Sequence, residues 1–257
     1  MVNTILRRAF ELFGPAVLGV FFALAIGAVL IIFSGANPVE AYQTMLRGAF
    51  GGQRQLTETA LKATPLLLIG LGLTVAFRAR VWNIGAEGQY FIGALFGSVV
   101  ALQFSTLSSI VLIPAILVAG VVGGALWGLI PALLRTKRGM NEIISTLMLN
   151  YIAIFLIEYV ARVPLRDPDG FLPESAQFEK VARLTGLFGT RIHPGVFLVL
   201  LLIPLVYVLI WRTSVGFRLR AVGSKASVAR FAGIYVERSI IFVLMFSGGM
   251  AGLAGII

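Results

Sequence analysis

The sequence predicts an all-α integral membrane protein, a polytopic helical bundle with about seven spans in this chain of 257 residues. Only 12% of the residues are charged, about half the share that is usual in soluble domains, and the mean hydropathy is +0.96. The apolar residues form long unbroken runs, whereas a β-sandwich or barrel would alternate with a period of two. The basic residues gather between these runs, so membrane topology explains the net charge of +10 and nucleic-acid binding is not expected.

Seven apolar runs are the predicted spans. The first, fourth, fifth and seventh are long enough to cross a bilayer, which needs roughly 20 residues, and the other three need residues from their flanks. The first run is longer than the apolar core of a signal peptide, so we interpret it as a retained span. In order, the runs are Gly14–Phe33, Leu61–Phe77, Tyr90–Phe104, Ile110–Leu134, Ile143–Val163, Val196–Trp211 and Ser239–Ile257.

The distribution of positive charge predicts a cytoplasmic N-terminus. With this orientation, 13 of the 21 Lys and Arg residues fall in cytoplasmic segments, as positive charges near spans usually do. The external loops are then about 34–60 and 164–195, the main cytoplasmic loop is about 212–238, and residues 1–257 form a single transmembrane domain. Because the last run has no polar flank and would end outside, we expect further C-terminal spans beyond Ile257.

Small residues recur at a spacing of four in several runs. Such stripes let helices approach closely in lipid, so they indicate helix packing. The stripes are Gly120, Gly124 and Gly128, then Gly93 with Gly97, and Gly248 with Gly252.

A carboxylate and two amides stand beside the third run, at Asn83, Glu87 and Gln89. An ionised carboxylate is costly at the bilayer centre, so Glu87 should face protein, water or a partner charge. The glycines between these residues favour a broken helix, which is tolerated only where the backbone is shielded or lines a cavity. A solvated loop at the membrane surface is the alternative.

A second polar pattern leads into the fifth run. Glu142, Ser145, Thr146 and Asn150 fall within about 140° of one helix face. This stripe suits a solute pathway or a hydrogen-bonded seam between helices, and both remain open. The candidate pathway residues from the two patterns are Asn83, Glu87, Gln89, Asn141, Glu142, Thr146 and Asn150.

The segment between the sixth and seventh runs is basic and rich in alanine. Ser224 or Ser227 can cap a short helix there, and Gly233 can end it. Such a helix can dock into a groove on a cytoplasmic partner, although an ordinary basic loop that only fixes topology is the alternative. The candidate docking residues are Arg218, Arg220, Gly223, Val228, Arg230, Phe231 and Gly233.

Several kinds of chemistry are excluded or unsupported. The chain has no cysteine and one histidine, so a disulfide, a thiol nucleophile or a multi-histidine metal cage is impossible. It carries no phosphate-binding loop and no common membrane hydrolase signature. We therefore predict no catalytic residue, no metal and no cofactor, and we do not expect an enzyme.

Three motifs in order resemble one family. Residues 83–89 read N-I-G-A-E-G-Q, residues 139–151 read G-M-N-E-I-I-S-T-L-M-L-N-Y, and residues 216–223 read G-F-R-L-R-A-V-G, followed by A-G-I and S-G-G-M-A-G-L-A-G. Together they resemble the permeases of ATP-binding-cassette importers for branched-chain amino acids, ribose-type sugars and nucleosides, in the nucleoside and simple-sugar branch. The resemblance covers roughly residues 35 to 257. Lys225-Ala226 departs from the Asn-Pro that the family usually has at this point of its coupling loop.

The resemblance implies a function and partners. The chain would be the permease subunit of an ATP-driven importer for a small polar solute, in a bacterial or archaeal cytoplasmic membrane. A cytoplasmic ATP-binding subunit, a second permease subunit, an external solute-binding protein and membrane lipid would be its partners, and residues 212–238 would couple to the ATPase. Family members usually run longer, which agrees with further spans. An ion-coupled secondary transporter is the alternative, although Glu87 and Glu142 lie near span ends and not deep inside the spans.

Overall fold

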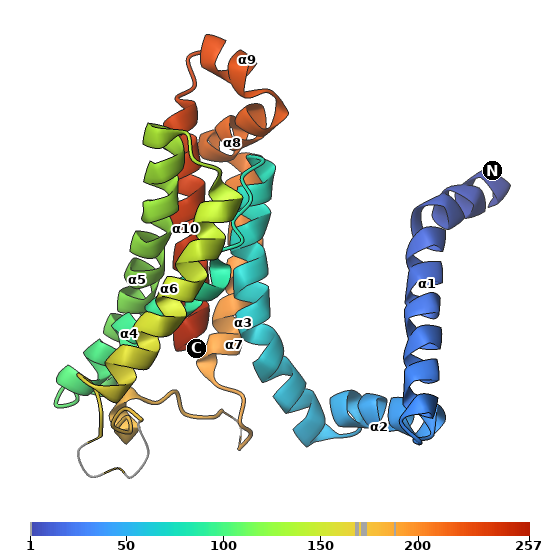
Figure 1. The fold of residues 1–257 in the computed structure, drawn as a ribbon, viewed down its shortest axis with the longest axis horizontal. Coiled ribbons are helices and arrows are strands. Elements are labelled where there is room, and N and C mark those ends of the chain that lie inside the picture. Colours follow the sequence, from blue (N-terminus) through green and yellow to red (C-terminus); the bar gives the residue numbers. More distant parts are fainter. Residues whose placement is uncertain (1, 168–169, 171–173, 188) are drawn as a thin grey trace. The chain divides into compact units, whose positions relative to one another are not determined.

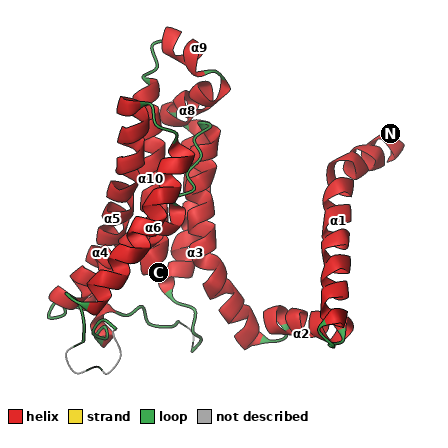
Figure 2. Cartoon of the chain, viewed as in Figure 1, coloured by secondary structure: helices red, strands yellow, loops and turns green. Residues whose placement is uncertain are grey.

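The computed structural model describes the backbone of all residues except 1, 168–169, 171–173 and 188, and the side chains of 1–13 and 16 are also left aside. The described residues form ten α-helices, one short 3-10 turn at Lys180–Ala182, and no strand beyond a single bridge between Arg166 and Ser175 (Figure 2). The all-α prediction is therefore confirmed. Contacts divide the chain into two compact units, Met1–Thr59 and Ala60–Ile257, and each is described in its own right.

The first unit consists of α1 (Val2–Phe33), α2 (Pro38–Phe50) and the first turns of α3 (Gln53–Arg78). The apolar part of α1 and the whole of α2 meet at a bend of 117°. Asn37 begins α2, because its side-chain oxygen accepts a hydrogen bond from the Val39 backbone N–H at 3.0 Å. The Tyr42 hydroxyl donates to the carbonyl of Leu24 at 2.6 Å and joins the two helices. The segment 34–60, predicted as an external loop, is thus largely helical.

The second unit is a helical bundle around α10 (Figure 1). About two thirds of the most apolar part of α10 is buried, 67%, against 22% to 28% in the other long apolar helices. The helices α4 and α5 pack directly against it, and α6 packs against α4 and α5. The unit contains the rest of α3, α4 (Ala86–Gln103), α5 (Ser109–Arg138), α6 (Glu142–Arg162), α7 (Pro194–Arg212), α8 (Ser214–Ser224), α9 (Ala226–Phe231) and α10 (Val236–Ile256).

Glycines bring the three central helices into backbone contact. A Cβ on Gly93 would lie 2.2 Å from the Cα of Gly252, and one on Gly124 would lie 2.1 Å from the carbonyl oxygen of Gly248. A Cβ on Gly252 would lie 2.1 Å from the carbonyl oxygen of Gly120. No side chain fits at these distances, so the predicted stripes are packing surfaces of α4, α5 and α10.

The predicted number of spans is supported only in part. Each of the seven apolar runs coincides with a helix, although three of the runs end one residue beyond it. Among the described residues, the helices long and apolar enough to span a membrane on their own are α3, α5, α6, α7 and α10. The bent pair of α1 and α2 gives a sixth if it counts as one span. The helix α4 has 18 residues and begins beside Glu87 and Gln89, which makes it short and partly polar. The prediction of about seven spans, with more beyond Ile257, is not confirmed.

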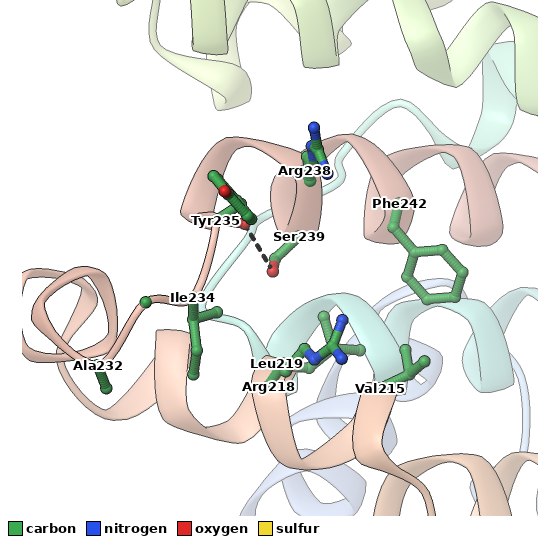
Figure 3. A pocket seen from close by; sticks show the side chains of 10 residues that line it. Val215, Arg218, Leu219, Ala232, Ile234, Tyr235, Arg238, Ser239 and Phe242 are labelled. Atoms are coloured by element: carbon green, nitrogen blue, oxygen red, sulfur yellow. Dashed lines mark hydrogen bonds between the residues drawn. The ribbon is translucent and has the colours of Figure 1, made fainter.

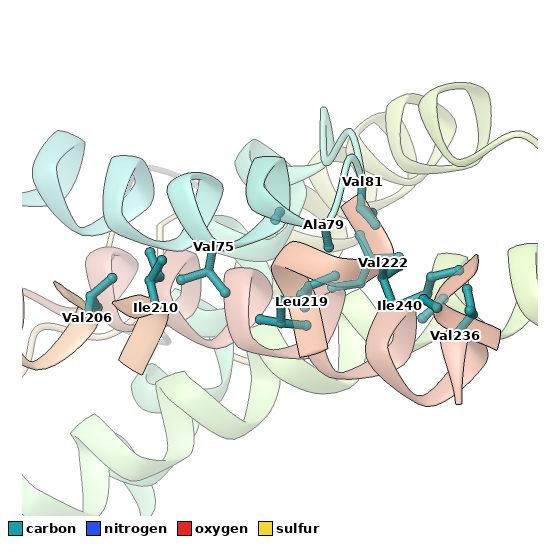
Figure 4. Close-up of a cluster of buried hydrophobic side chains, with 14 residues drawn as sticks. Val75, Ala79, Val81, Val206, Ile210, Leu219, Val222, Val236 and Ile240 are labelled. Carbon is teal, nitrogen blue, oxygen red and sulfur yellow. The ribbon is translucent and has the colours of Figure 1, made fainter. Parts of the chain in front are cut away.

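The largest buried apolar cluster lies where α3, α7, α8 and α10 meet (Figure 4). Val75 of α3, Ile210 of α7, Leu219 of α8 and Val243 of α10 are each at most 3% exposed. The short helices α8 and α9 therefore belong to the core of the bundle through one face, and they are not a free loop.

Candidate functional site

The connection between α3 and α4 enters the bundle as extended chain (Figures 1 and 2). Val81 and Asn83 are 0% and 3% exposed, whereas Trp82 and Ile84 are 54% and 45% exposed. This alternation is typical of extended backbone, whose side chains point to opposite sides in turn. The helix α4 then begins at Ala86, after the buried Gly85. The broken helix predicted from the glycines is confirmed.

Asn83 lies at the centre of a buried hydrogen-bond network that joins three segments. Its amide nitrogen donates to the side-chain oxygen of Gln89 at 2.7 Å and to the hydroxyl of Ser247 in α10 at 2.9 Å. Its amide oxygen accepts from the Gln89 amide at 3.2 Å and from the Gly85 backbone N–H at 3.1 Å. Buried amides need partners, and these two satisfy each other.

Asn150 of α6 hydrogen-bonds the backbone on both sides of this bend. Its side-chain oxygen accepts from the Gly88 N–H at 2.8 Å, and its side-chain nitrogen donates to the Ile84 carbonyl at 3.0 Å. Gly88 has no room for a side chain, since a Cβ there would lie 2.9 Å from the Asn150 side-chain oxygen. The backbone is thus shielded by protein, and the alternative of a solvated surface loop is wrong.

The other predicted pathway residues differ in their surroundings. Thr146 is fully buried and donates to the Glu142 carbonyl at 2.6 Å. Asn141 is exposed and caps α6 by accepting from the Ile143 N–H at 2.8 Å. The partly buried Glu142 forms an ion pair with Arg135 at 2.7 Å.

Glu87 is the exception among these residues. Its side chain is exposed, and within the described part of the chain no hydrogen bond or ion pair of its carboxylate is found. The seven predicted residues therefore divide into a buried group of Asn83, Gln89, Thr146 and Asn150, two residues at the start of α6, and one open carboxylate. Sequence reasoning missed Ser247 as a partner of Asn83, because a single hydroxyl within an apolar, glycine-rich run gives little signal.

The helix α8 is attached tightly to the ends of α3 and α7. A Cβ on Gly223 would lie 2.0 Å from the Arg78 carbonyl oxygen, so the two backbones touch. The Arg220 guanidinium donates to the Ile210 carbonyl and lies 4.9 Å from the ring centre of Trp211. The Arg78 guanidinium lies at the same distance, 4.9 Å, from that ring. Arg220 and Gly223 thus hold α8 against the ends of α3 and α7.

The helix α9 is attached through one residue and exposes the rest. Ala229 is 3% exposed in the apolar cluster, whereas Val228 and Phe231 are 55% and 95% exposed. Arg230 forms an ion pair with Glu237 at 2.5 Å. Gly233 has a φ of +79° and ends the helix as predicted. Lys225 occupies the N-cap position, so neither Ser224 nor Ser227 caps the helix.

Four of the predicted docking residues on α8 and α9 have exposed side chains. Arg218, Val228 and Phe231 are exposed, and Arg230 is exposed but paired within the chain. The ring of Phe231, at the tip of the short helix α9, has no aromatic partner in the described part of the chain.

Known proteins resemble the chain over most of its length. Residues 55–257 match a family described as "Branched-chain amino acid transport system / permease component". The glucose ABC transporter permease protein TsgB13 of Haloferax volcanii is 37% identical over 95% of this chain and 67% of its own length. The guanosine ABC transporter permease protein NupP of Bacillus subtilis is 33% identical over 97% and 72%, and the nucleoside ABC transporter permease protein NupB of Lactococcus lactis is 27% identical over 93% and 68%. No solved structure matches the chain significantly.

Proposed function

This chain belongs to the family of permease components of branched-chain amino acid transport systems, and on that premise we propose that it is the membrane-spanning subunit of an ATP-driven importer for a nucleoside or simple sugar. Members of this family are transport subunits and not enzymes. The family and the apolar helices make the chain a multi-pass membrane protein. The names of the relatives, which include glucose, guanosine and nucleoside transporters, support the solute class.

The observation that carries the proposal is the arrangement of α8 and α9. This chain has no phosphate loop, so we take the energy for transport to come from another subunit. The exposed apolar side chains of Val228 and Phe231 lie on α9, a helix that the bundle holds in place, and they offer a surface for such a subunit. When a cytoplasmic ATP-binding subunit bound to α9 changes its conformation, α9 and the adjoining α8 would move together. Because Gly223 of α8 touches the Arg78 carbonyl, that movement reaches the end of α3 and then the extended segment Val81–Gly85.

The extended segment and the start of α4 form the proposed pathway wall. Glu87 faces the solute path as an open carboxylate, and sugars and nucleosides offer hydroxyl donors to such a group. The segment is held in place by four buried side chains, those of Asn83, Gln89, Thr146 and Asn150. In the proposed orientation, the cytoplasmic end of α6 carries Asn141 and Glu142. Transport follows from a shift between inward-facing and outward-facing states, with the ATPase biasing the equilibrium.

The proposed assembly contains two permease subunits, an ATP-binding subunit and an external solute-binding protein, in the cytoplasmic membrane of a bacterium or archaeon. The N-terminus is cytoplasmic, and residues 1–257 act as a single permease domain. The ion-coupled alternative is less well supported, because Glu142 is already paired with Arg135 and Glu87 lies at the start of its helix.

A charge on the exposed tip of α9 tests the proposal. Phe231→Asp should release the ATP-binding subunit and abolish solute-stimulated ATP hydrolysis, because a charge would enter an apolar contact. Phe231→Leu, which keeps the apolar character, should retain both. Co-purification of the ATP-binding subunit and hydrolysis in proteoliposomes are the measurements. Full retention and normal hydrolysis with Phe231→Asp would contradict coupling through α9.

A further inference from the structure

The indole ring of Trp211, at the end of α7, is shared by two arginines from two other helices. The guanidinium groups of Arg78 in α3 and Arg220 in α8 each lie over this ring, 4.9 Å from its centre. Such contacts are cation–π interactions, for which tryptophan is the best aromatic partner. Within the described part of the chain, no carboxylate pairs with either arginine. The ring is therefore the group that both positive charges share.

The turn between α7 and α8 is tight. The Thr213 hydroxyl caps α8 by accepting a hydrogen bond from the Gly216 N–H at 3.1 Å, and it donates to the Leu209 carbonyl at 2.6 Å. A Cβ on Gly216 would clash with that same carbonyl oxygen, so the two helices touch through their backbones. Arg220 adds a hydrogen bond to the Ile210 carbonyl. The end of α7 and the start of α8 are therefore joined by specific polar contacts.

The end of α3 leads directly into the extended segment of the candidate site. The Val81 N–H donates to the Ala76 carbonyl at 3.1 Å. The Arg80 N–H donates to the Phe77 carbonyl at 3.0 Å, which completes the hydrogen-bond pattern of a Schellman helix end. Arg80 has a φ of +51°, the left-handed conformation that this helix end requires. A displacement of the last turn of α3 therefore carries Val81 and the following segment with it.

The contact between α8 and α10 is of a different kind. A groove of about 480 Å³ opens between them, with Val215 of α8 on one side and Phe242 of α10 on the other (Figure 3). Beyond the groove, their apolar side chains meet in the largest buried cluster. Among the described residues, no hydrogen bond or ion pair links α8 to α10. Because apolar contacts are not directional, they fix the relative position of two helices less firmly than polar contacts do.

We propose that Trp211 is a positioning residue that makes α8 and the ends of α3 and α7 move as one body relative to α10. Its two cation–π contacts join α3 and α8 through α7, and the contact of Gly223 with the Arg78 carbonyl is a second link between α3 and α8. A movement of α8 then reaches two spanning helices at once. This inference rests on the proposed function, because it starts from the movement that an ATP-binding subunit causes at α9 and α8.

Distances between spin labels test whether these helix ends are joined. The chain has no cysteine, so nitroxides can be attached to cysteines that replace Leu67 of α3 and Phe217 of α8, two exposed residues. In nanodiscs, the full chain should give one narrow distance. Trp211→Leu should broaden this distance, whereas Trp211→Tyr, which keeps an aromatic face, should leave it narrow. Tyr207→Leu removes an exposed ring one turn earlier in α7 and is the matched control, which should behave like the wild type.

Coupling is measured on the assembled importer with its ATP-binding subunit. Trp211→Leu should keep that subunit bound, because Val228 and Phe231 are unchanged. It should lower the amount of solute taken up per ATP hydrolysed by about tenfold, the shift expected from the loss of two exposed cation–π contacts. Trp211→Tyr should retain much of the coupling, and Tyr207→Leu should retain all of it.

Two results would overturn the proposal. A narrow distance in Trp211→Leu would make Trp211 an aromatic residue that only anchors the helix end at the membrane interface. A broadened distance with an unchanged ratio of uptake to hydrolysis would remove Trp211 from coupling. The distance measurement needs no ATP-binding subunit, so it remains readable if the proposed importer function itself fails.

Discussion

Asn150 is the single side chain on which the bend between α3 and α4 depends most, since it bonds both Gly88 and Ile84. Asn150→Ala would leave one buried N–H and one carbonyl without a partner. Each unsatisfied group costs about 1–3 kcal/mol, so unfolding in detergent should shift to clearly lower temperature and uptake should fall. Asn141→Ala, which removes only a helix cap worth about 1 kcal/mol, is the control. Equal unfolding temperatures for the two variants would contradict the role of Asn150.

Glu87 should behave in the opposite way, because its carboxylate is exposed and has no described partner. Glu87→Gln should leave the unfolding temperature unchanged and lower solute uptake by about tenfold, the effect of losing one charge-assisted hydrogen bond of about 1.4 kcal/mol. Glu87→Asp should retain part of the uptake. The measurement is uptake of labelled nucleoside or sugar by proteoliposomes at matched protein levels. Normal uptake with Glu87→Gln would remove Glu87 from the pathway.

At the residue level, the sequence predicted which side chains are polar and near the bundle, but not how they pair. Asn83 and Gln89 were identified by their place with Glu87 beside an apolar run, and Asn150 by its place on a polar helix face. Their pairing could not be predicted, since Asn83 and Ser247 are 164 residues apart. Asn83 is buried and Glu87 is exposed because the backbone at Val81–Gly85 is extended. Tertiary contacts determine the path of this segment, so the sequence alone does not predict it.

The helices α5 and α10 depend on glycine at their crossing. In Gly124→Ala the new Cβ would meet the Gly248 carbonyl oxygen at 2.1 Å, so the helices must separate. Loss of this contact should cost about 1–3 kcal/mol or more and lower the unfolding temperature. Gly70→Ala is the matched control, because nothing lies within 4 Å of its Cβ position and alanine favours the helix. A Gly124→Ala variant as stable as Gly70→Ala would contradict the close packing.

Element boundaries were predictable where local signals were strong. Gly233 ends α9 as expected, because a left-handed residue there favours glycine. The helix α2 was missed, although Asn37 and Pro38 form a helix start, because the segment was interpreted as an external loop. The cap of α9 was wrong in detail, since Lys225 has the extended backbone of an N-cap without a capping side chain.

The orientation of the whole molecule stays a prediction from charge, and a cysteine experiment tests it. The chain has no cysteine, so a single introduced thiol gives a clean signal. A cysteine at Ser224 should react in intact cells only with membrane-permeant reagents, whereas one at Ser175 should react with impermeant reagents. The basic residues at the end of α5 and around α8 would then face the cytoplasm. The reverse pattern of labelling would invert the topology and remove the basis for coupling through α9.

At this scale the all-α bundle followed from composition and apolar runs, but the number of spans did not. Run length alone cannot distinguish α4, which starts inside the bundle after an extended segment, from a helix that crosses the whole bilayer. The candidate spanning helices also differ in burial, from 22% in α7 to 67% in α10.

The extended segment before α4 also affects how the protein is made. The hydrogen-bonding partner of Ile84 and Gly88 is Asn150, more than 60 residues further along the chain, so it is synthesised later. Until α6 arrives, the backbone at this bend would be unsatisfied in lipid, where each such group costs several kcal/mol. Membrane insertion of α4 should therefore be deferred, with the nascent segment kept in a sheltered, hydrated environment until α6 has emerged.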